Sequence, residues 1–209
     1  MAIGNVLRSF AAPGASPVRL AWGAGTLWVA CVIPGHVFQV NPYTGAVLRS
    51  VPAPSLGPHG LTWGADTLWV GDTMTGLISE LNPYTGAVLR SFAAPGWNAS
   101  GLAWGAGIPW VCSDLTSIIC QLDPYTGAVL RSFTGPAPAG NAQGIAWGAG
   151  TLWYCETFNN RIYELDPYTG AVLRSFAAPG ANAQGVAWGD GTLWHCDPGT
   201  NLIYQIALN

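Results

Sequence analysis

One phrase, Trp-Gly-Ala-Gly-Thr-Leu-Trp, constrains the fold of this chain more than any other feature. It recurs five times with small changes at intervals of 41 to 43 residues, and the first tryptophans of the copies are Trp22, Trp63, Trp104, Trp147 and Trp188. Each copy has the apolar residues and turn residues of four short strands, and four-stranded units of about 40 residues are typical of β-propeller blades. The sequence therefore predicts an all-β, five-bladed β-propeller with four antiparallel strands in each blade.

The first copy shows where the strands and turns are expected. Strands are predicted over residues 18–22, 26–29, 36–40 and 46–50. The glycines of the turn from Gly23 to Gly25 allow the positive φ of a tight hairpin. In the turn from Asn41 to Gly45, proline presets φ at the second position and glycine takes the left-handed one.

The repeat count predicts how the ring closes. The phrase Val-Leu-Arg-Ser occurs five times, but the turn Pro-Tyr-Thr-Gly occurs only four times, at Pro42, Pro83, Pro124 and Pro167. The missing turn is where the chain ends fall. We therefore expect residues 1–209 to form a single domain in which residues 1–10 pair with residues 186–209 and remove a free strand edge.

Composition excludes several classes of partner. Charged residues make up 8% of the chain, the net charge is −3, and all seven basic residues are arginines, five of them in the Val-Leu-Arg-Ser phrase. No basic patch is available to neutralise a run of phosphates, so nucleic acid is not an expected partner. No apolar run approaches membrane-spanning length and no signal peptide is visible, so we expect no membrane association and a cytoplasmic location.

The cysteines support the same location. Cys112, Cys155 and Cys196 occupy one repeat position in three consecutive copies. Packed sheets lie about 10 Å apart, whereas a disulfide needs Cα atoms within roughly 7 Å. We therefore expect free, buried thiols. We also expect the protein to be mainly monomeric.

Two segments resemble a known family. Residues 152–162, Leu-Trp-Tyr-Cys-Glu-Thr-Phe-Asn-Asn-Arg-Ile, resemble the blade phrase of the virginiamycin B (streptogramin) lyase-like propellers, and Pro58-His59-Gly60-Leu61 resembles the start of their inner strand. The blade pattern is also similar to NHL-type repeats. The resemblance implies a propeller and a lyase activity that uses a divalent cation and two histidines. The family has seven blades, whereas this chain has five copies and only His59 at the equivalent positions, so only His59 carries over.

The positions at which the copies differ gather on one face. In a propeller, the loops entering the first strand and leaving the second strand open on the same side, and these loops vary here. We therefore expect a polar axial pocket on this face for a small-molecule or carbohydrate ligand. Its expected ligand-binding residues are Ser100, Gln143, Gln184, His195 and Trp97, whose ring could stack on a sugar.

Carboxylates on the same face allow two interpretations. Asp72, Glu156 and Asp197 follow second strands and offer the oxygen ligands that calcium or magnesium prefers. Alternatively, each carboxylate caps its own loop by accepting backbone N–H groups. The sequence alone leaves both interpretations open.

Three functions remain compatible with the sequence. The leading hypothesis is a binding or scaffold propeller with a polar axial pocket and no assignable catalytic activity. The alternative is a metal-assisted lyase or hydrolase that uses His59 as general base together with Glu156. A bare repeat scaffold without a ligand is the third.

Overall fold

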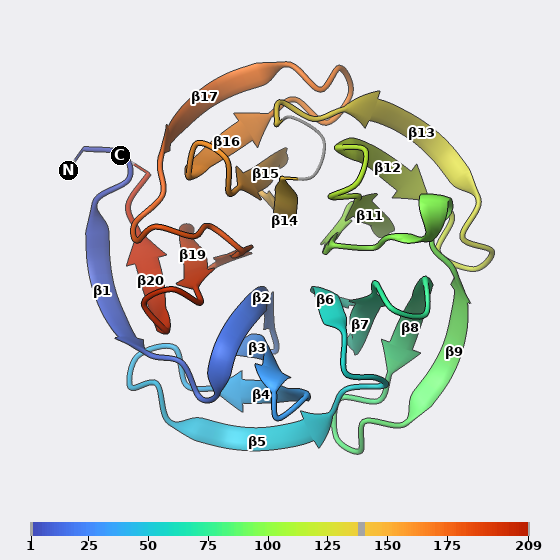
Figure 1. The fold of residues 1–209 in the computed structure, drawn as a ribbon, viewed down its shortest axis with the longest axis horizontal. Coiled ribbons are helices and arrows are strands. Elements are labelled where there is room, and N and C mark those ends of the chain that lie inside the picture. Colours follow the sequence, from blue (N-terminus) through green and yellow to red (C-terminus); the bar gives the residue numbers. More distant parts are fainter. Residues whose placement is uncertain (1, 138–140, 209) are drawn as a thin grey trace.

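Five four-stranded antiparallel sheets surround a central axis (Figure 1) in the computed structural model, which describes residues 2–137 and 141–208. The protein is a five-bladed β-propeller, and the fold class predicted from the repeat is confirmed. Within each blade the strands run from the axis to the outside of the ring. The described residues include no helix that is both long and apolar enough to cross a membrane.

The strand bounds follow the repeat. The first blade contains β2 (Ala15–Gly23), β3 (Thr26–Ile33), β4 (His36–Val40) and β5 (Val47–Pro52). The second contains β6 (Pro58–Gly64), β7 (Thr67–Asp72), β8 (Leu77–Leu81) and β9 (Val88–Ala93). The third contains β10 (Gly101–Gly105), β11 (Ile108–Cys112), β12 (Ile118–Leu122) and β13 (Val129–Thr134). The fourth contains β14 (Ala142–Gly148), β15 (Thr151–Glu156), β16 (Arg161–Leu165) and β17 (Val172–Ala177).

The fifth blade is built from both ends of the chain. It contains β18 (Gly185–Gly189), β19 (Thr192–Asp197) and β20 (Leu202–Ile206), and β1 (Val6–Ala11) pairs with β20 as its outer strand. In Figure 1 the two chain ends lie beside each other at this blade. Because β1 covers it, β20 has no free outer edge on which another chain could pair.

The repeated hairpin turn needs its two glycines for different reasons. Ala24 and Gly25 have positive φ values of 51° and 70°, which is the two-residue turn that suits a twisted hairpin. Gly23 does not have a positive φ, contrary to the expectation that both glycines serve the backbone. A Cβ atom on Gly23 would lie 2.0 Å from Cγ of Trp63 in the next blade. The first glycine therefore makes room for a neighbouring tryptophan.

This contact recurs around the ring. The other glycine and tryptophan pairs are Gly64 with Trp104, Gly105 with Trp147, Gly148 with Trp188 and Gly189 with Trp22. Each inner-strand tryptophan also packs on a fully buried tryptophan of the preceding blade; the rings of Trp63 and Trp28, for example, stack with centroids 5.5 Å apart. Aromatic rings of this size bury a large apolar area. The core therefore lies between blades, and the Trp-Gly phrase joins one blade to the next.

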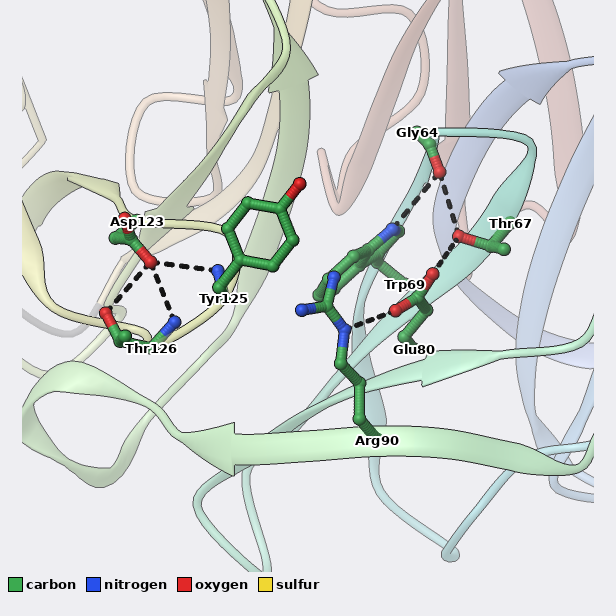
Figure 2. A network of polar contacts seen from close by, with 8 residues as sticks. All are labelled: Gly64, Thr67, Trp69, Glu80, Arg90, Asp123, Tyr125 and Thr126. Atoms are coloured by element: carbon green, nitrogen blue, oxygen red, sulfur yellow. Dashed lines mark hydrogen bonds and ion pairs between the residues drawn. The ribbon is translucent and has the colours of Figure 1, made fainter.

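A second repeated contact lies on the outside of the ring, which we call the rim. Figure 2 shows it between the second and third blades. Cζ of Arg90 lies 5.0 Å from the ring centroid of Trp69 and 5.1 Å from that of Tyr125 in the next blade, and Nε lies 2.5 Å from Oε2 of Glu80. Thr67 joins the network by donating its hydroxyl to Glu80 at 2.9 Å. The arginine thus links its own blade to the next one.

The rim contact is made by each Val-Leu-Arg-Ser phrase that has a Pro-Tyr-Thr-Gly turn beside it. The further pairs, with distances from Cζ to the ring centroid, are Arg8 and Tyr43 at 5.2 Å, Arg49 and Tyr84 at 4.6 Å, and Arg131 and Tyr168 at 5.1 Å. Arg174 faces the chain ends, where no such turn exists, and donates to the Leu208 carbonyl at 3.1 Å. Arg174 also forms an ion pair with Glu164.

The five cysteines are free and buried, as predicted. Burial raises the pKa of Cys112 to about 11 and the pKa of Cys155 to about 12. These groups are therefore neutral thiols at physiological pH, and thiolate chemistry is not available to them in this fold.

Candidate functional site

The centre of the ring is occupied by a single arginine. The guanidinium of Arg19, from β2, contacts residues of the first, third, fourth and fifth blades, so it must lie on the axis. The other four blades have glycine at this position: Gly60, Gly101, Gly144 and Gly185. Arg19 faces Ala30 across the hairpin, where three of the other blades have a larger cysteine. The larger side chain of Arg19 is therefore accompanied by a smaller residue, Ala30, on the paired strand.

Among the described residues, the hydrogen bonds that Arg19 donates all end on neutral oxygens. Nε donates to the Ser100 carbonyl, and Nη1 donates to the Val18 carbonyl at 2.5 Å. Nη1 also donates to the carbonyl of Gln184 at 3.1 Å and to its Oε1 at 3.0 Å, while Nη2 donates to Oε1 of Gln143 at 3.1 Å. Within the described residues, the ion pairs are both at the rim and neither involves Arg19. Arg19 is thus a buried positive charge without a carboxylate in contact.

Arg19 also orients the side-chain amides of two glutamines. Because Gln143 and Gln184 turn their side-chain oxygens toward the guanidinium, their amide N–H groups must point away from it. Both side chains are half-buried, and Nε2 of Gln184 reaches Oδ1 of Asn182 at 3.2 Å. The guanidinium therefore directs the amide donors of both glutamines away from itself.

His59 is the third half-buried group near this centre. Burial lowers the pKa of His59, and the charge of Arg19 lowers it further, whereas the carboxylates of Asp114 and Asp72 act in the opposite direction. The neutral imidazole is therefore favoured near pH 7. We call Arg19, His59, Gln143 and Gln184 together the axial mouth.

A separate cavity lies on the axis on the other side of Arg19. It measures about 50 Å³ and is lined by inner-strand residues between Leu20 and Trp22 and by their equivalents in the other blades. This space is enough for a few water molecules. Arg19 directly precedes Leu20 in β2, so the cavity begins one residue along the strand from the axial mouth.

Two other predicted ligand-binding residues have different surroundings. The Ser100 side chain is fully buried and donates to the Cys112 carbonyl at 2.9 Å, so Ser100 contributes its own carbonyl to Arg19 and not its hydroxyl to the mouth. Trp97 ends a short 3-10 helix, η1 (Pro95–Trp97), beside the third blade. Its side chain lies outside the described residues.

The three predicted metal ligands each accept a backbone N–H group of their own loop, and Asp197 also accepts two from the loop that precedes β18. Asp72 accepts N–H groups from Met74 at 2.7 Å and Thr75 at 2.9 Å. Glu156 accepts the N–H of Asn159 at 2.9 Å. Asp197 accepts N–H groups from Ala181 at 2.6 Å, Asn182 at 2.9 Å and Thr200 at 3.0 Å. All three side chains are buried, so the geometry agrees with the capping alternative.

These residues do not fit a calcium or magnesium ion at the axial mouth. In the part of the chain that the structure describes, no three histidine, cysteine, aspartate or glutamate side chains form a group that could hold a metal ion. The predicted set of Asp72, Glu156 and Asp197 is therefore not assembled. The charge of Arg19 also opposes a second cation at the centre, because like charges repel strongly where water is excluded.

The predicted role of His195 in ligand binding is also corrected. His195 is fully buried in β19, and its ring stacks on Tyr204 with centroids 6.0 Å apart. Nδ1 lies 3.0 Å from the Gly185 carbonyl, and Nε2 has no hydrogen-bond partner among the described residues. Burial lowers the pKa of His195 to about 4. The residue belongs to the packing between blades and does not reach the axial mouth.

Arg19 is the central residue that the sequence analysis missed. A signal was present, because Arg19 replaces the glycine found in the other four copies and lies outside the Val-Leu-Arg-Ser phrases. Comparing the copies position by position, one residue beyond His59 and its equivalents, would have identified it.

No protein-family model matches the sequence. A search of curated proteins also finds no match. Solved structures, in contrast, resemble the fold closely. The glutaminyl cyclase of Myxococcus xanthus has a TM-score of 0.84 at 16% sequence identity, over 98% of this chain and 96% of that chain. A catalytically inactive virginiamycin B lyase from Staphylococcus aureus with quinupristin has a TM-score of 0.59 at 19% identity, over 94% and 71% of the two chains.

A computationally designed protein, Ika8, is also similar, with a TM-score of 0.52 at 15% identity over 90% of this chain and 57% of that chain. At these identities the likeness establishes the propeller fold and not an activity. The fold expected from the resemblance to virginiamycin B lyase is confirmed, and the cyclase matches it over nearly the whole length of both chains.

Proposed function

We propose that this protein is a binding propeller that takes a small ligand with a carboxylate group at the axial mouth. The observation that carries the proposal is Arg19, a buried guanidinium held by neutral oxygens alone. A buried charge is costly unless an opposite charge balances it, and the interaction is strong where the effective dielectric constant is low. The Asp114 carboxylate acts on Arg19 without contacting it, and an anionic group bound at the mouth would add to this balance.

The groups around Arg19 suit a carboxylate. The amide N–H groups of Gln143 and Gln184 face away from the guanidinium, and the half-buried His59 supplies a further polar group at the same end of the axis. Hydrogen bonds to an ionised acceptor are shorter and stronger than those between neutral groups. The ligand carboxylate would therefore accept hydrogen bonds from the two amides and be attracted electrostatically by the guanidinium of Arg19.

The enzyme alternative receives less support from the geometry. It pairs His59 with Glu156, but the Glu156 carboxylate is fully buried and accepts the N–H of Asn159 in its own loop. The similar solved structures include two enzymes, yet their identities of 16% and 19% extend only to the fold. Binding is therefore the function that we put to the test.

Glucuronate and glucose provide a matched pair of probes, because they differ at the carboxylate. Isothermal titration calorimetry should give at least about tenfold tighter binding of glucuronate, which corresponds to about 1.4 kcal/mol. The preference should disappear in Arg19→Gln and persist in Arg90→Gln, which changes an arginine at the rim. Acetate tests the carboxylate without the sugar ring. Equal affinity for glucose and glucuronate, together with no binding of acetate, would contradict the proposal.

A further inference from the structure

A second cavity arises where two blades lack an aromatic residue. The position that carries Phe38, Tyr163 and Tyr204 on the third strands of the first, fourth and fifth blades is Ser79 in the second and Cys120 in the third. In the fourth and fifth blades the aromatic ring packs on a ring of the neighbouring strand, as Tyr163 does on Tyr154. Cys120 instead faces Val111, and the missing ring leaves space between the second and third blades.

This space is a pocket of about 140 Å³. It lies between the loop that contains η1 and strands β11 and β12, and its lining includes Pro95, Asn98, Val111, Ser113, Ile118 and Cys120. Val111 and Cys120 are buried, whereas Gly96, Thr116 and Ile118 at the opening are exposed. A small molecule can therefore enter from the surface without unfolding a blade.

Two polar atoms in the lining have no partner. Oδ1 of Asn98 and Oγ of Ser113 are buried without a hydrogen bond to any described residue, and the two residues are only 9% and 8% exposed. Folded proteins satisfy nearly all buried polar groups, so two orphaned oxygens in one pocket indicate a missing partner. One atom can only accept a hydrogen bond, whereas the hydroxyl can also donate one.

We propose that this pocket binds one small aromatic alcohol, of the size and chemistry of phenol. A cavity of about 150 Å³ accommodates a benzene ring, and Pro95, Val111 and Ile118 provide apolar walls for one. The phenol hydroxyl donates to Oδ1 of Asn98 and accepts from Oγ of Ser113. The Cys120 sulfur lies in the same lining, and contacts of sulfur with aromatic rings are favourable. Burial raises the pKa of Cys120, so the group is a neutral thiol.

The neighbouring blade offers a natural comparison. A hollow of about 170 Å³ in the second blade is lined by Thr75, Gly76, Leu77, Ala93 and Ala94, and none of these residues has a buried polar atom without a partner. The hollow beside Leu77 thus offers space alone, whereas the pocket beside Cys120 offers space together with two oxygens that have no partner among the described residues. The proposal predicts that phenol binds in the pocket beside Cys120 and not in the hollow of the second blade.

Titration with phenol and with toluene, followed by chemical shifts in NMR spectra, tests the proposal. Phenol should shift the signals of Val111 and Ile118 and bind about tenfold more tightly than toluene, since toluene leaves both oxygens unpaired. Cys120→Tyr introduces the residue of the fourth and fifth blades, fills the pocket and should abolish phenol binding. Ser79→Tyr fills the equivalent position of the second blade and should leave phenol binding unchanged.

A second variant keeps the test decisive if Cys120→Tyr does not fold. Ser113→Ala should weaken phenol binding about tenfold and leave toluene binding unchanged. The pocket is also independent of the axial mouth, so Arg19→Gln should not change phenol affinity. Equal affinities for phenol and toluene, or no shift with millimolar phenol, would mean that water satisfies Asn98 and Ser113 and would overturn the proposal.

Discussion

The axis and the rim of this propeller both depend on arginine, but the two regions use it in opposite ways. At the rim, Arg90 has a side chain that is 34% exposed, pairs with Glu80 and lies over Tyr125, and the same contact with tyrosine recurs around the ring. On the axis, Arg19 is 2% exposed, contacts neutral oxygens and occurs in one blade alone. Repetition marks contacts that build blades, whereas the single departure creates the centre of the candidate site.

Burial should decide how much each contact contributes to stability. Exposed ion pairs typically contribute at most about 1 kcal/mol, because water and salt screen them. A buried polar network is more sensitive, since removing one member leaves its partners unpaired where water is scarce. The predictions below test whether burial or repetition sets the size of the effect.

The largest effect is expected from a contact that is both repeated and buried. Gly23→Ala places a Cβ atom 2.0 Å from Cγ of Trp63, and the overpacking should lower the free energy of unfolding by at least about 3 kcal/mol. Gly25→Asp in the same turn is the control, because a Cβ there meets no atom within 4 Å and Asp66 adopts a φ of 61° at this position in the second blade. Urea unfolding measures both variants. Similar losses for the two would contradict the packing role assigned to the first glycine.

The direct comparison of the axis with the rim uses one substitution at two positions. Arg19→Met removes the donor that five oxygen contacts share and should lower the free energy of unfolding by about 2 to 3 kcal/mol. Arg90→Met should lower it by about 1 kcal/mol or less, and the loss should shrink in high salt. Urea unfolding at two salt concentrations separates the cases. Equal losses at both positions would show that burial does not distinguish the two arginines.

Acid should affect the interior through His195. Its pKa is about 4 in the fold, below the ordinary value of 6.5, so the unfolded chain binds a proton first as pH falls. Stability is unaffected above pH 6.5 and decreases between pH 6.5 and 4, by about 2 kcal/mol at pH 5. His195→Val, which introduces the residue found at this position in three other blades, should remove this part of the pH dependence. An unchanged slope between pH 7 and pH 5 in the variant would contradict the assignment.

The smallest effect is expected at the rim. Glu80→Gln introduces the residue found at the same position in the first, third and fifth blades, where Gln39 and Gln205 donate to their threonines at 3.0 Å. The ion pair with Arg90 is lost, but the contact with Thr67 can be replaced. The free energy of unfolding should fall by less than about 1 kcal/mol, measured by urea unfolding. A loss of unfolding free energy as large as that of Arg19→Met would show that contacts at the rim and on the axis contribute equally to stability.

The fold could be read from the sequence because its contacts are local or repeated. The hairpin turns, the strand lengths and the closing strand from Val6 follow from turn residues and from counting copies. The packing of Trp63 on Gly23 was hidden, because it joins residues of different blades and the turn offered a sufficient local reason for glycine. Periodicity predicts which face of a strand is buried, but it does not predict which atom of the neighbouring blade contacts that face.

The candidate site was predicted in part. The sequence indicated the face, and it named His59, Gln143 and Gln184, which lie around Arg19 at the axial mouth. It grouped Asp72, Glu156 and Asp197 as metal ligands, whereas each carboxylate bonds to backbone N–H groups of nearby loops. Equivalent positions in different blades share a face, but the direction of each side chain depends on its nearest backbone N–H groups.

The sequence by itself determined five blades, their register and the closure of the ring, because each copy repeats the same local instructions for strands and turns. The tertiary structure decided that Arg19 fills the axis, that Cys120 leaves a pocket and that His195 is buried. These outcomes depend on distances between residues that are far apart in the chain: Arg19 meets Ser100, Gln143 and Gln184 only when the ring is closed. Whether a charge is buried, and whether a polar atom has a hydrogen-bond partner, depends on how the neighbouring blades pack around it.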